Sequence, residues 1–321
     1  MNKKILLFTL LLVVPFTFLK AQINITFTPD ATVTNKSIIH EMEGNLSTVL
    51  TEINSAYKDN RALNLAGLPM TQFAKGELSK LWANSLFYCK DNNMSTRIWN
   101  FSNGYMVRQV PLMITPRDNS GSKEVFQEAV VEFDGSGNIS DFKFASLKQM
   151  GKSLEHAGNT EEVKHKIAIL SYCDRLRTAY NTRDIRFFQQ FFRGDTLIIK
   201  GQANDGKPIS SAYNKEYVNT LQNIFAKRYW IEVKFSEIGT NDKGEASSGI
   251  IRSTKNPNLY AVRFQQEWIA SDYSDESYVF LLFDFTNEDA PAIPVRILAP
   301  VWVGGQKISD KELYSIEDFE K

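Results

Sequence analysis

Two stretches of the chain, 123 residues apart, carry the same spacing of apolar residues. In each stretch the apolar positions advance by three or four residues, a spacing that places them on one face of a helix. The first set is Ile39, Met42, Leu46, Val49, Ile53 and Tyr57, and the second is Val163, Ile167, Leu170, Cys173, Leu176 and Tyr180. Both sets end on Ala-Tyr, and both precede a second helical stretch and then strands. The repeat predicts two related halves.

The N-terminus has the pattern of a signal peptide. Lys3 and Lys4 precede an apolar run over residues 5–19, and the small residue Ala21 follows. This run is shorter than the roughly 20 residues that a membrane-spanning helix needs. We therefore predict that residues 1–21 are removed before Gln22 and that the mature protein is exported and soluble, either periplasmic or secreted. An uncleaved N-terminal anchor is the alternative. A lipoprotein is not expected, because no Cys lies near the predicted cleavage site.

Charge and length limit the class of protein further. The chain has 37 basic and 37 acidic residues, and residues 1–21 hold three of the basic ones, so the mature chain carries 34 − 37 = −3. This charge argues against a nucleic-acid partner, which favours a basic surface. The 300 residues after the predicted cleavage site are more than a domain with a single hydrophobic core usually has, which predicts two domains.

The two cysteines, Cys89 and Cys173, lie one in each half. An exported protein could oxidise them to a disulfide, but Cys173 lies on an apolar helix face, where Cys is commonly a small buried hydrophobe. Both states stay open. No Cys or His pair has the spacing of zinc ligands, so neither a metal nor a cofactor is predicted.

The residue pattern divides the chain into a lead-in segment (22–34), a first unit (35–147), a linker (148–158), a second unit (159–303) and a polar tail (304–321). The first unit reads as helices over 35–58 and 70–83, then strands over 95–101, 105–114, 125–133 and 139–145. The second reads as a helix from Asn159, a short helix over 184–192, a strand over 196–202, a helix over 214–226, and strands over 230–238, 260–268, 278–285 and 293–301. This order predicts an α+β fold of two tandem cone-like domains, each with helices packed on a curved, mainly antiparallel sheet.

The second unit resembles the nuclear transport factor 2-like fold, also called SnoaL-like. The resemblance rests on Ala179-Tyr180-Asn181 with Asp184 and Phe187-Phe188, on residues 194–199, and on the segment from Trp268 to Asp284. It covers residues 159–303, and the first unit would be a more distant copy over 35–147. The resemblance implies a pocket at the open end of the curved sheet. The family includes isomerases, cyclases, hydrolases, dehydratase subunits and members that bind without catalysis, so the fold implies no reaction.

Seven residues are candidates for the lining of such a pocket. They are Tyr180, Asp184, Phe264, Gln266, Trp268, Gln127 and Tyr57. Gln266 and Gln127 are amides within apolar strand faces, and each could contact a ligand or bond to the backbone. Tyr57 and Tyr180 could present their hydroxyls to a pocket or pack at its rim. Asp184 could be a general base or a helix cap, and Arg296 could pair with Asp284 if their strands are neighbours.

No catalytic residue is predicted. His40, His156 and His165 all fall outside the predicted concave strands, where a general base would be expected. The leading hypothesis is therefore an exported, non-catalytic protein that binds a small apolar ligand or an envelope protein. One alternative is a pocket enzyme for a small apolar substrate, with Asp184 or Asp284 as base and Tyr180 as donor. Another is a structural or assembly role in the cell envelope, which includes a homo-oligomer.

Overall fold

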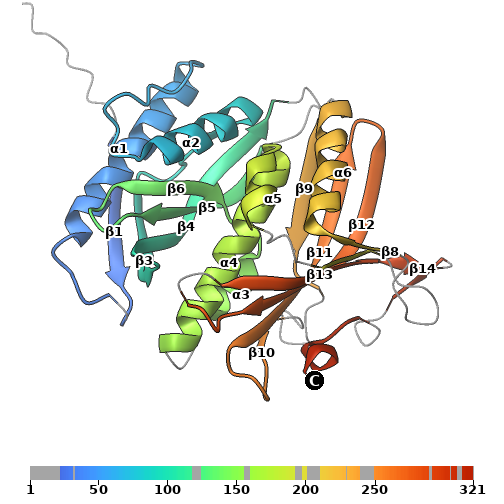
Figure 1. The fold of residues 1–321 in the computed structure, drawn as a ribbon. Coiled ribbons are helices and arrows are strands. Elements are labelled where there is room, and N and C mark those ends of the chain that lie inside the picture. The colour runs from blue at the N-terminus through green and yellow to red at the C-terminus, as the bar shows by residue number, and fades with distance from the viewer. Residues whose placement is uncertain are drawn as a thin grey trace, which may run out of the picture.

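A computed structural model describes residues 22–31, 33–117, 124–154, 160–191, 197–200, 210–228, 230–238, 249–288, 291–303, 305–308 and 313–320. The predicted signal peptide and His156 lie outside these residues. The chain forms two units, each with helices packed on a curved sheet, and the long helix α4 stands between them (Figure 1). The predicted α+β class with two helix-on-sheet units is therefore confirmed.

Within its described residues, the N-terminal unit has two helices and six strands. They are β1 (Asn24–Pro29), α1 (Ile39–Lys58), α2 (Gln72–Asn84), β2 (Ser85–Tyr88), β3 (Asn93–Phe101), β4 (Gly104–Pro116), β5 (Val125–Phe133) and β6 (Ile139–Phe144). The strand order is β1-β3-β4-β5-β6, with β2 also paired to β4. α1 buries the predicted stripe of Met42, Leu46, Val49 and Ile53 in the core of this unit. Thr71 caps α2, since its hydroxyl accepts a hydrogen bond from the Ala74 amide at 3.2 Å.

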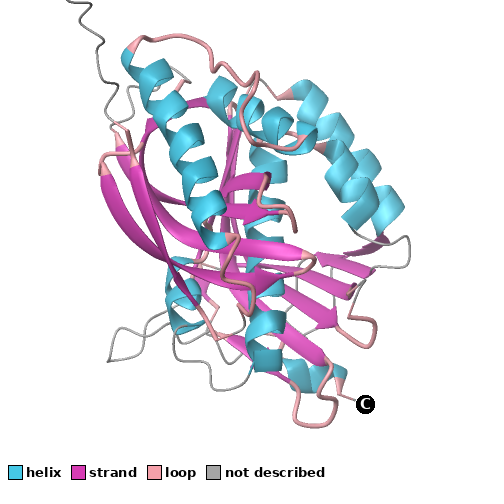
Figure 2. Cartoon of the chain, turned by 90° about the vertical axis from the view of Figure 1, so that its left-hand side faces the viewer, coloured by secondary structure: helices cyan, strands magenta, loops and turns pink. Residues whose placement is uncertain are grey.

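The C-terminal unit places three helices against seven strands. Its elements are α4 (Thr160–Asn181), α5 (Ile185–Phe191), β7 (Leu197–Lys200), β8 (Ser210–Tyr213), α6 (Asn214–Lys227), β9 (Ile231–Ser236), β10 (Ile250–Arg252), β11 (Leu259–Ala270), β12 (Tyr273–Asp284) and β13 (Ala292–Pro300). The order is β10-β11-β12-β13-β7-β8, with β9 also paired to β11. Figure 2 turns the N-terminal unit toward the viewer and shows strands that curve behind the helices.

The two units share one unusual feature of topology. In the first, β2 and β3 pair with the two ends of one edge of β4, and in the second, β9 and β10 do the same along β11. A long antiparallel strand pair follows in both. The units differ in where a parallel strand joins, because β1 pairs with β3 while β7 pairs with β13. The similarity that the sequence predicted between the halves therefore corresponds to an arrangement of antiparallel strands that both units share, while their edge strands differ.

Helix α4 joins the units, because both of its faces are buried. Trp99, Met106 and Val130 project from the sheet face opposite α1 and α2, and they belong to the same apolar cluster as α4 and the C-terminal sheet. Alternate residues of the N-terminal strands thus pack on different helices. Helices therefore cover both faces of the N-terminal sheet.

Three further boundaries need correction. The lead-in segment includes β1, which is part of the sheet. Residues 148–154 of the predicted linker include α3 (Lys148–Ser153), and Met150 and Leu154 are buried in the shared cluster. The predicted polar tail carries β15 (Gln306–Lys307), which pairs with β14 (Trp302–Val303) just before the tail, and a 3-10 helix (Ile316–Phe319). Ile316 packs on Phe280 and Ile297, because β12 and β13 are apolar on both faces and their outer face needs cover.

Among the helices of the described residues, none combines the length and the apolar composition that a membrane crossing requires.

Candidate functional site

Four of the predicted site residues meet inside the C-terminal unit. The Tyr180 hydroxyl, from α4, bonds to the Tyr217 hydroxyl of α6, and its ring lies edge-on to Trp268 at 5.2 Å. Phe264 and Gln266 share the helix-facing side of β11, as the alternation predicts. Tyr180, Phe264 and Gln266 are buried, so their side chains fill the interior of the cone instead of lining an open pocket.

Arg296 is at the centre of this group and was not among the predicted site residues. Its guanidinium is fully buried, donates to the Gln266 amide oxygen at 3.4 Å and to the Tyr217 hydroxyl at 3.3 Å, and lies over the Tyr180 ring at 5.5 Å. Burial lowers its pKa, but the surrounding tyrosines outweigh burial and raise it, so Arg296 stays charged. Gln266 therefore has a structural partner within the protein.

The remaining candidates lie apart. Gln127 donates to the Ala145 carbonyl at 2.6 Å, and Tyr57 packs on Tyr88 with ring centroids 4.5 Å apart. Asp184 caps α5 through the Phe187 amide at 3.3 Å. The suggested pair of Arg296 with Asp284 is wrong, although β12 and β13 are neighbours. Asp284 stands opposite Ala292, three residues past the Leu281 that faces Arg296, and its carboxylate accepts from the Thr286 amide at 2.8 Å.

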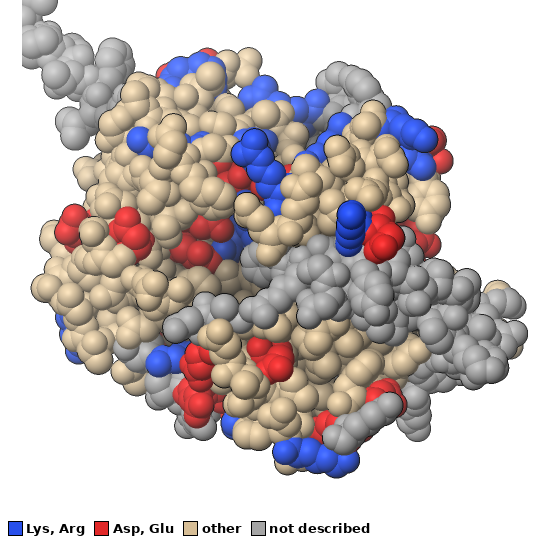
Figure 3. Space-filling view, viewed as in Figure 1, with Lys and Arg blue, Asp and Glu red and all other residues tan. Residues whose placement is uncertain are grey.

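A cleft lies between the two units, with a volume of about 1110 Å³. The β3–β4 turn, β5 and β6 form one side, while α4 and the strand ends Phe285 and Ile293 form the other. Gly104 is required in the turn, because a Cβ there would lie 1.9 Å from the Phe133 carbonyl oxygen. In the space-filling view, acidic and basic atoms lie together in a recess near the middle of the face (Figure 3).

Lys143 forms the floor of this cleft. Its side chain is fully buried, and its ammonium pairs with Glu132 and, at 3.0 Å, with Asp141. Burial lowers the pKa of Lys143, but the two carboxylates outweigh it and raise the pKa overall. Glu132 also accepts from the Ser171 hydroxyl of α4 at 2.6 Å, so the floor links both units.

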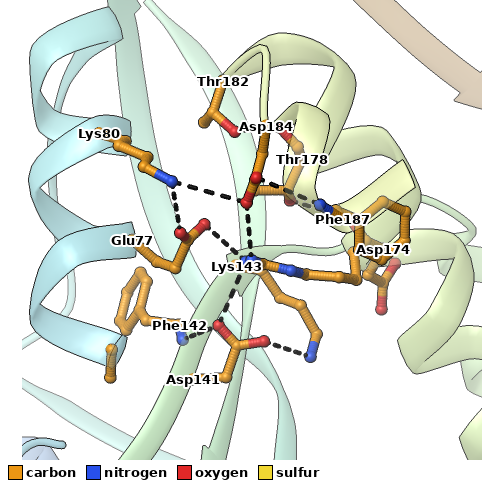
Figure 4. A network of polar contacts seen from close by, with 12 residues as sticks. Glu77, Lys80, Asp141, Phe142, Lys143, Asp174, Thr178, Thr182, Asp184 and Phe187 are labelled. Carbon is orange, nitrogen blue, oxygen red and sulfur yellow. Dashed lines mark hydrogen bonds and ion pairs between the residues drawn. The ribbon is translucent and has the colours of Figure 1, made fainter. Parts of the chain in front are cut away.

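Arg175 of α4 extends the same network toward α2, and Figure 4 shows the Glu77, Asp184 and Asp141 side chains that surround it. It donates to Glu77 of α2 at 2.6 Å and to Asp184 at 3.3 Å, and Lys80 lies 2.8 Å from Glu77. With Lys143, Asp141 and Glu132, the network holds three cations and four anions, and 3 − 4 = −1. Because the charges nearly cancel, the floor favours neither anionic nor cationic ligands strongly.

The opposite wall is aromatic and contains His165. The His165 ring stacks on Phe285 with centroids 4.2 Å apart, and Tyr172 lies edge-on to Phe283 at 5.2 Å. His165 Nδ1 lies 3.1 Å from the Tyr260 hydroxyl, and Nε2 lies 3.3 Å from a Glu288 carboxylate oxygen. The cleft therefore combines an apolar wall with groups that donate and accept hydrogen bonds.

The sequence interpretation set His165 aside because it lies on a helix and not on a strand. The signal that could have found it is a second periodic stripe on α4, formed by His165, Ala168, Tyr172 and Arg175, all of which line the cleft. The acid–base set proposed from the sequence is not assembled, because Tyr180 bonds inside the cone while Asp184 is held by Arg175. The described residues contain no group of three or more His, Cys, Asp and Glu side chains placed to hold a metal ion.

No protein-family model matches the chain, and no curated protein matches it. Solved structures resemble parts of it. An NTF2-like protein from Cytophaga hutchinsonii is 11% identical over 45% of this chain and 100% of its own, with a TM-score of 0.29. A protein from Bdellovibrio bacteriovorus is 12% identical over 64% of this chain and 79% of its own, with a TM-score of 0.33. The beta subunit of benzoate 1,2-dioxygenase from Burkholderia mallei is 13% identical over 41% and 87%, with a TM-score of 0.31. The sequence predicted a resemblance to NTF2-like proteins, and the Cytophaga hutchinsonii protein that is similar to part of this chain carries that description.

Proposed function

We propose that this protein is an exported, non-catalytic binding protein that holds a small molecule in the cleft between its two units. The observation that carries the proposal is the cleft itself. Its volume of about 1110 Å³ is slightly above the range of small-molecule sites, roughly 300–1,000 Å³. Aromatic side chains line it together with a larger number of polar and charged groups, so it is more polar than most such sites.

The lining refines the kind of ligand. The sequence suggested a small apolar molecule, but Lys143, Glu132 and Asp141 form a charged floor. An apolar surface placed on this floor would remove water from the charged groups and offer them no hydrogen bond in return. Phe283 and Tyr172 offer apolar area on the other side. A molecule with an apolar body and at least one polar group fits both sides of the cleft.

The structure has a cleft in which a pocket enzyme would hold its substrate, but it does not bring together the acid–base residues that the sequence suggested. Asp184 is committed to Arg175 and to the cap of α5, and Asp284 accepts a backbone amide at the end of β12. Neither carboxylate lies beside Tyr180, which bonds to Tyr217. Binding without chemistry needs no such pair, so these contacts favour the binding protein.

Ala168 offers a direct test. It is half-buried on α4 and lines the cleft, so Ala168→Trp places an indole in the space that a ligand would fill. Thr48→Trp is the matched control, because Thr48 is exposed on α1 and outside the cleft lining. Asn103→Trp, at the exposed turn on the opposite side, repeats the obstruction without touching a helix.

The measurement is a thermal-shift screen of amphiphilic small molecules on the native protein, with hits confirmed by calorimetry. We expect hits that both cleft variants lose and that Thr48→Trp keeps. Hits that bind all three variants equally would place the ligand elsewhere and reject the cleft. Export is tested separately by sequencing the N-terminus of the protein made with residues 1–21 attached, where Gln22 is the expected first residue.

A further inference from the structure

Glu288 occupies a position in the cleft that needs an explanation. Its side chain is 60% exposed, yet one carboxylate oxygen lies 3.3 Å from Nε2 of the buried His165. A carboxylate of this kind is an acceptor, so Nε2 carries the proton. On the other side of the ring, Nδ1 lies 3.1 Å from the Tyr260 hydroxyl. The contacts thus present Nε2–H to the cleft as a fixed donor.

Packing fixes the direction of this donor. The imidazole stacks on Phe285 at 4.2 Å and stands edge-on to Tyr260 at 5.1 Å, so the ring cannot turn freely. Glu288 is different, because it follows the end of β12 and most of its side chain is in water. Holding a long exposed side chain in one position costs conformational entropy. The His165 donor is therefore rigid, while another carboxylate can replace that of Glu288 as its acceptor.

We propose that His165 Nε2–H, together with the exposed Lys164 beside it, is a recognition site for the carboxylate group of a small organic acid, and that Glu288 fills this site when no ligand is present. The inference rests on the proposed binding function and names its ligand class. The apolar body of the acid lies against Tyr172 and Phe283, on the same wall of the cleft.

The chemistry of the site favours a carboxylate over a phosphate. Arg175, which could form a bidentate fork, already holds Glu77 and Asp184. A single imidazole N–H and one ammonium match a monovalent group, and the protein's own carboxylate shows that the geometry accepts one.

The experiment uses 3-phenylpropionate and its neutral amide as probes, with affinity measured by calorimetry on wild type, Glu288→Gln, His165→Phe and Glu41→Gln. We expect wild type to prefer the acid to the amide. Glu288→Gln should bind the acid about tenfold more tightly, or ~1.4 kcal/mol, because it removes a competing and repelling charge. His165→Phe keeps the stack on Phe285 and should lose the preference. Glu41→Gln, which removes an exposed carboxylate from α1, should match wild type.

Nitrogen NMR of the histidines supplies a readout that a purely structural role would not move. The chain has three histidines, so their ring nitrogens can be assigned by substitution. We expect the His165 Nε2 signal to shift with 3-phenylpropionate and in Glu288→Gln, and to stay in place with the amide. Equal affinity for acid and amide, weaker acid binding in Glu288→Gln, or no binding of the acid at millimolar concentration would each overturn the carboxylate site. Neutral hits lost in Ala168→Trp would still support the cleft.

Discussion

The contact between Arg108 and Asp174 gives a sharp test of how the units are joined. Asp174 of α4 is completely buried, and its carboxylate lies 2.7 Å from the guanidinium of Arg108 on β4. Its other oxygen accepts from the Ser146 amide at 2.6 Å and from the Ser146 hydroxyl at 2.7 Å. The pair with Arg108 is a close ionic contact and not an aligned hydrogen bond. Its strength comes mainly from the low polarity of the buried surroundings, which strengthens the attraction between the two charges.

Asp174→Ala leaves the Arg108 guanidinium buried without its carboxylate. Loss of one member of a buried ion pair costs about 3–5 kcal/mol of unfolding free energy. The orphaned Ser146 amide adds about 1–3 kcal/mol, although the two losses overlap. We expect a total of at least about 4 kcal/mol, since both groups are screened from water.

The assay is urea unfolding at neutral pH, followed by tryptophan fluorescence. Asp59→Ala is the matched control, because Asp59 is 57% exposed in its pair with Arg61, and such surface pairs contribute about 0–1 kcal/mol. The double variant Arg108→Met with Asp174→Ala should recover part of the loss, because the uncompensated charge is gone. A loss below about 1 kcal/mol for Asp174→Ala, or strictly additive effects in the double variant, would refute the reasoning.

Two further predictions concern titration and thiol chemistry. The folded protein raises the pKa of Lys143, so its contribution to stability is complete below the ordinary Lys pKa of about 10.4 and is lost as pH rises through the higher folded value. The free energy of unfolding, measured in urea from pH 9 upward, should therefore fall less steeply with pH in Lys143→Met than in Lys36→Met, a control at an exposed position. Equal slopes for the two variants would contradict this. Cys89 and Cys173 are free and buried, and burial raises the pKa of Cys89 to about 11 and that of Cys173 well above its usual range. Neither thiol should react with a disulfide reagent at pH 8 until urea unfolds the chain, and rapid labelling of the native protein would show that they are accessible.

The sequence located most helices and strands because their signals are local. The stripe from Met42 to Ile53 predicted α1, and the alternation along β5 predicted that strand over the residues that form it. The strands β2 and β8 were missed, because four residues carry too short a pattern to distinguish a strand from a loop. The fold was therefore predictable at the level of elements and of the two units.

The site was not predictable in the same way. Gln266 was singled out correctly as a buried amide, but its partner is Arg296, whose position depends on the β11–β13 register. His165 and Lys143 lie 22 residues apart in sequence and in different units, and the cleft that they share exists only because α4 packs on both sheets. Hydrophobic periodicity indicates which face of a helix or strand a residue occupies. It does not indicate which other element packs against that face.

The amino-acid sequence by itself determined where α1 and α4 run, that strands follow helices in each half, and the balance of charge, since these depend on neighbours within a few residues. Only the tertiary structure decided that α4 is buried on both sides, that Arg296 is enclosed by tyrosines, and that a cleft with His165 opens between the units. The physical reason is that burial and ion pairing depend on contacts between residues that are distant in sequence, and those contacts arise only when the sheets and helices pack together.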